Sequence, residues 1–139
     1  LYFVNRSCMN SFFKAFCPGR IHEDHIFSVP LHLYANRAKY IPMPYFKRRI
    51  RNNSIMNQSF GMKNIDGYVA ALTELKRLSQ EKAEWKGLID LYLTQVLNDI
   101  VWIGHKMTFP SKIATYCIFK ELSFNKYISL RNYLVFWFK

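Results

Sequence analysis

The stretch "NIDGYVAALTELKRLSQ", Asn64 to Gln80, decides the fold that the sequence predicts. Its apolar residues recur at spacings of three and four, which places them on one face of a helix. These residues are Ile65, Tyr68, Val69, Leu72, Leu75 and Leu78. Asn64 is the predicted N-cap, and Asp66 lies in the first turn, where the helix dipole favours an anion. We therefore expect an amphipathic helix here.

The following stretch, Ser79 to Lys106, predicts a second helix that ends at Gly104. Its expected core face consists of Trp85, Leu88, Ile89, Tyr92, Val96 and Ile100, widened by Leu93, Leu97 and Ile103. One helix from Ile65 to Ile103 would be about 58 Å long, which is long for a single small domain. We expect a break with Ser79 as the second N-cap. A break at Gly87 and one continuous helix are the alternatives.

The segments before and after these two predicted helices have patterns that favour extended structure in part. In "HIFSVPLHLY", Phe27, Val29, Leu31 and Leu33 alternate with polar residues or Pro30, which favours an edge strand. "AKYIPMP", Ala38 to Pro44, would be the second arm of a hairpin. The C-terminal segment 111–139 is compatible with helix or strand: Ser111 suits a helix cap, and "YLVFWFK" suits a strand that must be covered. The expected class is α+β, helix-dominated, with a central helix pair and a short N-terminal β-hairpin.

Size and charge indicate one intracellular domain. Half of the 139 residues are apolar, which is enough for a core. We expect 1–22 to be a leader or basic tail and 23–139 to be a single domain with its helical core at 64–105. Three cysteines argue against a disulfide framework, and no apolar run predicts a transmembrane segment. The net charge of +11 resides in the flanks, because residues 64–105 hold four cations against six acids. An organellar or viral context fits this layout.

The basic aromatic segment 37–51 is the candidate nucleic-acid-binding site. Guanidinium groups bind phosphate oxygens in pairs, and aromatic rings stack on unpaired bases. The residues assigned to it are Arg37, Lys39, Tyr40, Tyr45, Phe46, Lys47, Arg48, Arg49 and Arg51. The sequence therefore predicts a small non-catalytic protein that binds single-stranded RNA or DNA, as a ribonucleoprotein or replication accessory component.

Part of this segment, "AKYIPMPYFKRRIRN", Ala38 to Asn52, resembles a run found late in the replication initiator proteins of microvirus-type phages. Those initiators run Lys-Tyr/Leu-Pro-Arg-Tyr-Tyr-Lys, where this chain has only Tyr45-Phe46. The resemblance implies a nicking motif of two histidines flanking one bulky apolar residue. The chain has no such triplet, so no catalytic residue is carried over.

The spacing of the Cys, His and acidic residues predicts neither a metal site nor a catalytic site. "CPGRIHEDHIFSVPLH" offers Cys17, His22, Glu23, Asp24, His25 and His32, but their spacing matches no zinc signature. The favoured interpretation is exposed turn histidines, with no metal and no cofactor. The five glycines are scattered, and no thiol, base and orienting group are brought together, so no enzymatic activity is predicted.

Two alternatives remain open. The helix pair would be an interaction module or membrane-surface module, with Trp85, Tyr92 and Trp102 facing a partner protein or a second copy. Alternatively, only the helix pair is a folded unit and the flanks are incidental.

Overall fold

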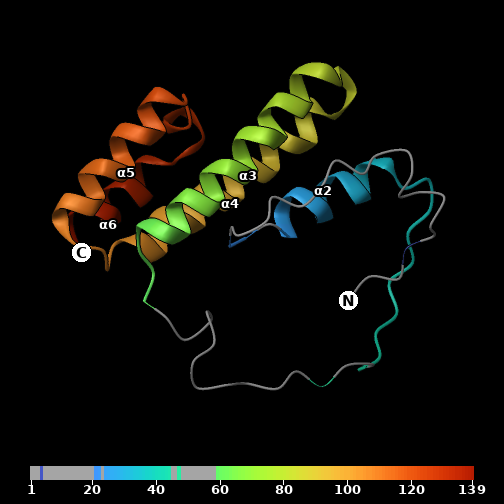
Figure 1. The fold of residues 1–139 in the computed structure, drawn as a ribbon, viewed down its shortest axis with the longest axis horizontal. Helices are drawn as coiled ribbons and strands as arrows, with labels where there is room; N and C mark the ends of the chain where they lie inside the picture. Colours follow the sequence, from blue (N-terminus) through green and yellow to red (C-terminus); the bar gives the residue numbers. More distant parts are fainter. Residues whose placement is uncertain (1–3, 5–20, 23, 45–46, 48–58) are drawn as a thin grey trace.

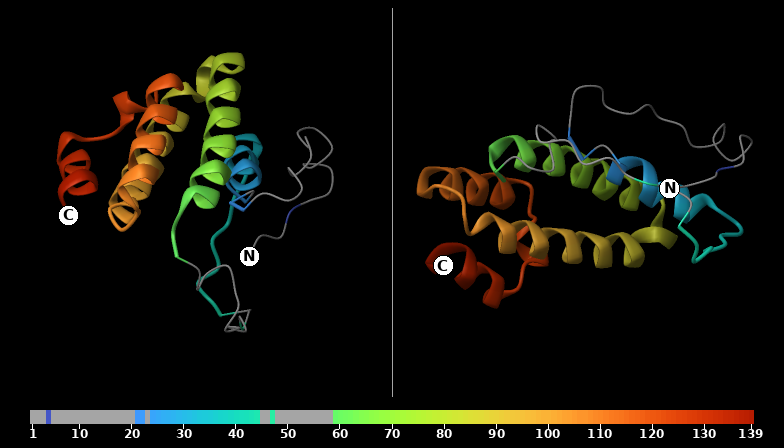
Figure 2. Two further views of the ribbon diagram at one scale, coloured as in Figure 1. Left: turned by 60° about the vertical axis from the view of Figure 1, so that its left-hand side comes forward. Right: turned by 90° about the horizontal axis from the view of Figure 1, so that it is seen from below.

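The computed structural model describes residues 4, 21, 22, 24–44, 47 and 59–139, and its elements are all helical (Figure 1). They are α2 (Asp24–Tyr34), α3 (Met62–Glu81), the 3-10 turn η2 (Ala83–Trp85), α4 (Lys86–Gly104), α5 (Phe109–Glu121), η3 (Asn125–Tyr127) and α6 (Leu130–Phe138). The helices α3 and α4 form an antiparallel pair. Helix α2 lies on one side of this pair and α6 on the other (Figure 2).

The central pair confirms the expected helices but corrects their caps. Helix α3 begins after Gly61, whose N–H donates to Asn64 Oδ1 at 3.0 Å, so Asn64 closes the first turn instead of preceding it. The break falls at Lys82, before η2. Ser79 is no cap, because it is buried within α3 and its hydroxyl donates to the Lys76 carbonyl at 2.7 Å. Helix α4 ends at Gly104 as predicted.

The core lies between the pair and the C-terminal helices. Its largest fully buried side chains are Ile65, Leu72, Leu75, Ile89, Leu93, Leu97, Ile100, Phe119, Phe124 and Phe136. The buried stripe of α4 is centred on Leu93 and Leu97. The prediction had these two residues at the edge of the core face, so its centre was wrong. Leu88 and Ile103, expected in the core, are exposed.

The predicted β-hairpin is wrong, and the α+β class with it. Phe27, Val29, Leu31 and Leu33 lie in α2, which contains Pro30, and the described residues hold no strand. A lone hairpin is marginally stable in water, whereas a helix satisfies its backbone internally and buries Leu31. Residues 35–44 follow as an irregular stretch, mostly exposed.

The C-terminal segment is helical. Helix α5 begins at Phe109, with Thr108 as N-cap and Pro110 in the first turn, so Ser111 is not the cap. Helix α5 lies beside α3, where Lys76 Nζ donates to the Leu122 carbonyl at 2.6 Å. The run "YLVFWFK" forms most of α6 and is covered only in part: Phe136 is buried, whereas Leu134 and Phe138 are exposed. The division into 1–22 and 23–139 stays a prediction.

Candidate functional site

The basic aromatic segment is described in part. Arg37, Lys39, Tyr40 and Lys47 are exposed, and the Tyr40 ring is 85% accessible. The remaining assigned residues, Tyr45, Phe46, Arg48, Arg49 and Arg51, lie outside the described residues. The described half of the segment therefore presents an aromatic ring between cations to solvent.

The three aromatic residues assigned to an interaction face lie in two places. Trp85 contacts the Tyr34 ring edge-on at 4.6 Å, and the Tyr92 hydroxyl contacts His25, so α2 covers both. Trp102 lies at the other end of α4, with Lys139 Nζ 5.3 Å from its ring centre. The face that α4 offers at Trp85 and Tyr92 is thus occupied within the chain.

A second group of exposed apolar side chains lies on α5 and α6. We call it the α5–α6 face; it consists of Phe109, Ile113, Leu130, Leu134 and Phe138, all exposed. The last three are four residues apart and form one stripe along α6, with accessible fractions of 75%, 51% and 84%. The Trp137 ring lies 6.0 Å from that of Phe109 and joins the two helices. A surface helix normally carries polar residues on its solvent side, whereas α6 carries apolar residues there.

Charges near the α5–α6 face are mostly positive. Arg131 and Lys139 are exposed beside the α6 stripe, and on α5 Lys120 is exposed next to the exposed Glu121. Helix α6 contains no acidic residue. Burial, followed by Tyr116, raises the pKa of Tyr133 to about 12, so its hydroxyl is neutral.

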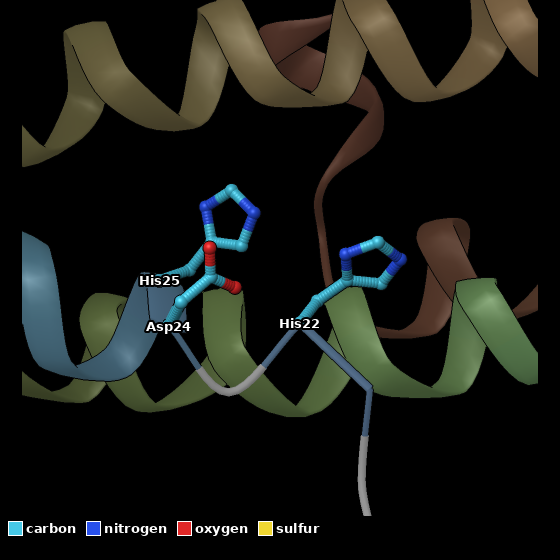
Figure 3. A group of neighbouring side chains, drawn as sticks. All are labelled: His22, Asp24 and His25. Atoms are coloured by element: carbon cyan, nitrogen blue, oxygen red, sulfur yellow. The ribbon is translucent and has the colours of Figure 1, made fainter. Parts of the chain in front are cut away.

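A polar cluster lies on the opposite side, where α2 meets α3 and α4. His22, Asp24 and His25 each offer one ligand atom, and these atoms lie within 4.8 Å of one another. Figure 3 shows the two rings side by side with the Asp24 carboxylate next to them. His22 has a φ of 66°, a left-handed conformation that turns the chain before α2 begins.

Neighbouring helices hold both rings of this cluster. The His22 ring stacks on Tyr68 of α3 at 3.8 Å between centres, and its Nε2 lies 3.4 Å from Asn64 Nδ2. The His25 Nδ1 contacts the Tyr92 hydroxyl of α4. Burial lowers the pKa of His25, partly offset by Asp24, and so favours the neutral imidazole.

Gly67 of α3 allows the chain just before the cluster to lie against that helix. A Cβ at Gly67 would lie 2.2 Å from the carbonyl oxygen of Ile21, so only glycine lets the chain before His22 approach α3 so closely. The sequence offered one signal for the cluster, two histidines three residues apart. It offered none for Tyr68 and Tyr92, which come from helices far along the chain.

Comparisons with protein-family models, with curated proteins and with solved structures found no match. The resemblance to microvirus initiators therefore stays a prediction. Within the described part of the chain, every helix is too short or too polar to cross a membrane.

Proposed function

We propose that this protein is a non-catalytic helical module that binds anionic membrane surfaces peripherally through the α5–α6 face. The observation that carries the proposal is the stripe of Leu130, Leu134 and Phe138, which points away from the core. Helices that lie in a membrane interface combine Leu, Phe and Trp with Lys and Arg. Helix α6 has these apolar residues together with Arg131, and Lys139 follows it directly.

Charge favours a lipid surface over a second copy of the chain. Residues 106–139 carry six cations and one acid, Glu121. Two copies docked through this face would bring Arg131 and Lys139 of each close to those of the other. An anionic bilayer offers both an apolar layer and opposite charge, so it complements the face in both respects.

The expected affinity is moderate. Full burial of a Leu or Phe side chain contributes about 1.5–3 kcal/mol, and each cation near an anionic leaflet contributes about 1 kcal/mol. The side chains of a peripheral helix are only partly buried in the interface. The module would therefore bind reversibly, with strength that falls as salt screens the cations.

Vesicle sedimentation tests this proposal. We expect the protein to pellet with vesicles of mixed phosphatidylserine and phosphatidylcholine, and less with phosphatidylcholine alone. The double variant Leu134→Ser with Phe138→Ser should stay in the supernatant. The matched control, Leu88→Ser with Leu91→Ser, removes two exposed leucines of α4 outside the face and should pellet like the wild type.

Cys117 supplies a second readout, because it is exposed on α5 four residues after Ile113. A polarity-sensitive fluorophore on Cys117, with Cys8 and Cys17 changed to Ser, should shift to the blue when anionic vesicles are added. Equal pelleting of the two double variants, or an unchanged spectrum, would contradict the proposal. Concentration-dependent dimers in light scattering, without vesicle binding, would favour a second copy instead.

Nucleic-acid binding is the second candidate function, and the exposure of Tyr40 between Arg37 and Lys39 favours it. If the six cations of the segment meet phosphates of a single strand, the logarithm of affinity falls with that of salt with a slope of about −4. Changing Arg48, Arg49 and Arg51 to Glu should abolish this binding in a filter assay. Unchanged binding in that variant, or binding without salt dependence, would rule this function out.

A further inference from the structure

The cluster of His22, Asp24 and His25 lies away from the α5–α6 face and has no part in the proposed membrane binding. Its three ligand atoms come from a turn and the first residues of α2, and they lie within 4.8 Å of one another. Figure 3 shows a nitrogen of each imidazole directed toward the other ring, with the carboxylate beside them. Ligand atoms of a tetrahedral zinc site are about 3.3 Å apart at bond lengths of about 2 Å, so modest side-chain rotation closes the site.

The outer nitrogens already have partners. Nδ1 of His25 contacts the Tyr92 hydroxyl, and Nε2 of His22 lies next to the Asn64 amide. Histidines that bind metal ions usually engage a second group through the other ring nitrogen, which orients the ring. An ion would be held by Nε2 of His25 and Nδ1 of His22, the nitrogens that face each other in Figure 3, with the proton of His22 on Nε2 beside Asn64 Nδ2. Asp24 is exposed and free to turn a carboxylate oxygen toward it.

We propose that His22, Asp24 and His25 bind one Zn²⁺ ion, with water completing the tetrahedron. Two imidazoles and one carboxylate suit a transition metal, whereas Mg²⁺ and Ca²⁺ prefer oxygen ligands alone. The site is anchored to the fold by Tyr68 and Tyr92, so it forms only when α2 packs on α3 and α4.

Zinc titration of the full chain tests the site. The background should carry Ser at Cys8, Cys17 and Cys117, so that thiols cannot take up the ion. We expect one Zn²⁺ per chain in calorimetry. Asp24→Asn and His25→Gln each remove a direct ligand, so each should lower the affinity by at least the roughly 10–100-fold that loss of an outer-shell partner causes. His32→Ala is the matched control: His32 lies on α2, its Nδ1 contacts the Ser28 carbonyl at 2.7 Å, and its loss should leave zinc binding unchanged.

Histidine NMR shows which rings bind. On adding Zn²⁺, the ring signals of His22 and His25 should move and those of His32 and His105 should not. No zinc uptake in the thiol-free background would overturn the site, as would wild-type affinity in both ligand variants or loss of uptake in His32→Ala.

Asn64→Asp gives a test in the opposite direction. If His22 binds metal through Nδ1, its ring proton is on Nε2, which then acts as a donor. In wild type the neighbouring atom is Asn64 Nδ2, which is also a donor, so Nε2 lacks an acceptor there. A carboxylate at position 64 supplies that acceptor and still accepts from the Gly61 N–H. Zinc affinity should therefore rise about tenfold, and a fall would contradict the assignment of Nδ1.

Discussion

Asn98 illustrates how one polar residue of α4 holds a distant helix. Its Nδ2 donates to the Tyr127 carbonyl at 2.9 Å, and its Oδ1 accepts from the Ser129 N–H at 3.0 Å and from Asn132 Nδ2 at 2.7 Å. These bonds join α4 to the beginning of α6. Periodicity places Asn98 on the polar side of its helix but cannot reveal a partner about thirty residues away.

Changing Asn98 to Ala should destabilise the protein by about 1–3 kcal/mol, because three backbone or amide groups of η3 and the start of α6 lose their partner. Urea denaturation followed by circular dichroism measures the change. Gln95→Ala is the control: among the described residues the Gln95 amide donates to Asp99, one turn along α4, so the loss should stay below about 0.5 kcal/mol. Equal losses in the two variants would contradict the role of Asn98.

Tyr127 and Asp90 should make stability depend on pH. Hydrogen bonds from Lys86 and then Tyr127 lower the pKa of Asp90, and the Tyr127 hydroxyl lies 2.7 Å from its Oδ1. A carboxyl with a lowered folded pKa stabilises the protein above its unfolded pKa of about 3.9, and this contribution disappears as pH falls through the folded pKa.

In Tyr127→Phe one of these bonds is lost, and the pKa of Asp90 rises toward its ordinary value. We expect a loss of about 1 kcal/mol at pH 7, at the low end for a charged partner because Asp90 is partly solvated. Urea denaturation at pH 7 and at pH 3 should show the difference from wild type narrowing in acid. A difference that is constant or widens in acid would contradict this role of the hydroxyl.

At the scale of helices, α6 packs through an aromatic ring that lies against the glycine at the end of α4. A Cβ at Gly104 would lie 3.0 Å from Cε2 of Phe136 and 3.5 Å from Sδ of Met107. The ring of Phe136 therefore packs directly on the end of α4, with no room for a larger residue. From the sequence, Gly104 is predicted only to end the helix. Nothing in the sequence indicates that it also makes room for the ring of Phe136.

Gly104→Val should overpack this contact and cost about 1–3 kcal/mol, seen as a lower midpoint in urea. Gly87→Ala is the matched control, since nothing lies within 4 Å of a Cβ there and alanine favours the helix. That variant should gain about 0.5–1 kcal/mol. Stabilisation by Gly104→Val would mean that α6 does not pack on α4 in this way.

The sequence predicted the two longest helices because their apolar period is sustained over many turns. It failed for α2, where the apolar residues fit a period of two and Pro30 argued for an edge strand. The stretch that forms α6 is apolar at most positions, so its sequence suits a strand as well as a helix. Helix or strand is decided there by contact with α4.

At the scale of the whole molecule, packing extends well beyond the predicted core of 64–105, since Phe119, Phe124 and Phe136 are fully buried. The basic segment could be located from composition alone, because charge and aromatic content are properties of neighbouring residues. The histidine cluster could not, because its histidines are near one another in sequence but their supporting residues are not.

Limited trypsin digestion should cut exposed, irregular segments before it cuts the packed helices. Cleavage after Arg37 or Lys39, in the exposed irregular stretch, should precede cleavage after Lys76 or Lys112, since Lys112 is buried and Lys76 binds the Leu122 carbonyl. Mass spectrometry of the early fragments gives the order. Cleavage after Lys106, Lys112 and Lys120 as early as after Arg37 would instead mean that the C-terminal helices do not pack on the pair.

The α3–α4 pair separates α2 from α6, and this stacking sets the orientation of an adsorbed protein (Figure 2). On a vesicle held through the α5–α6 face, the side that carries α2, with His25 in its first turn, points into bulk solution. A chelator in that solution can therefore remove an ion without desorbing the protein, and zinc loading and adsorption should titrate independently.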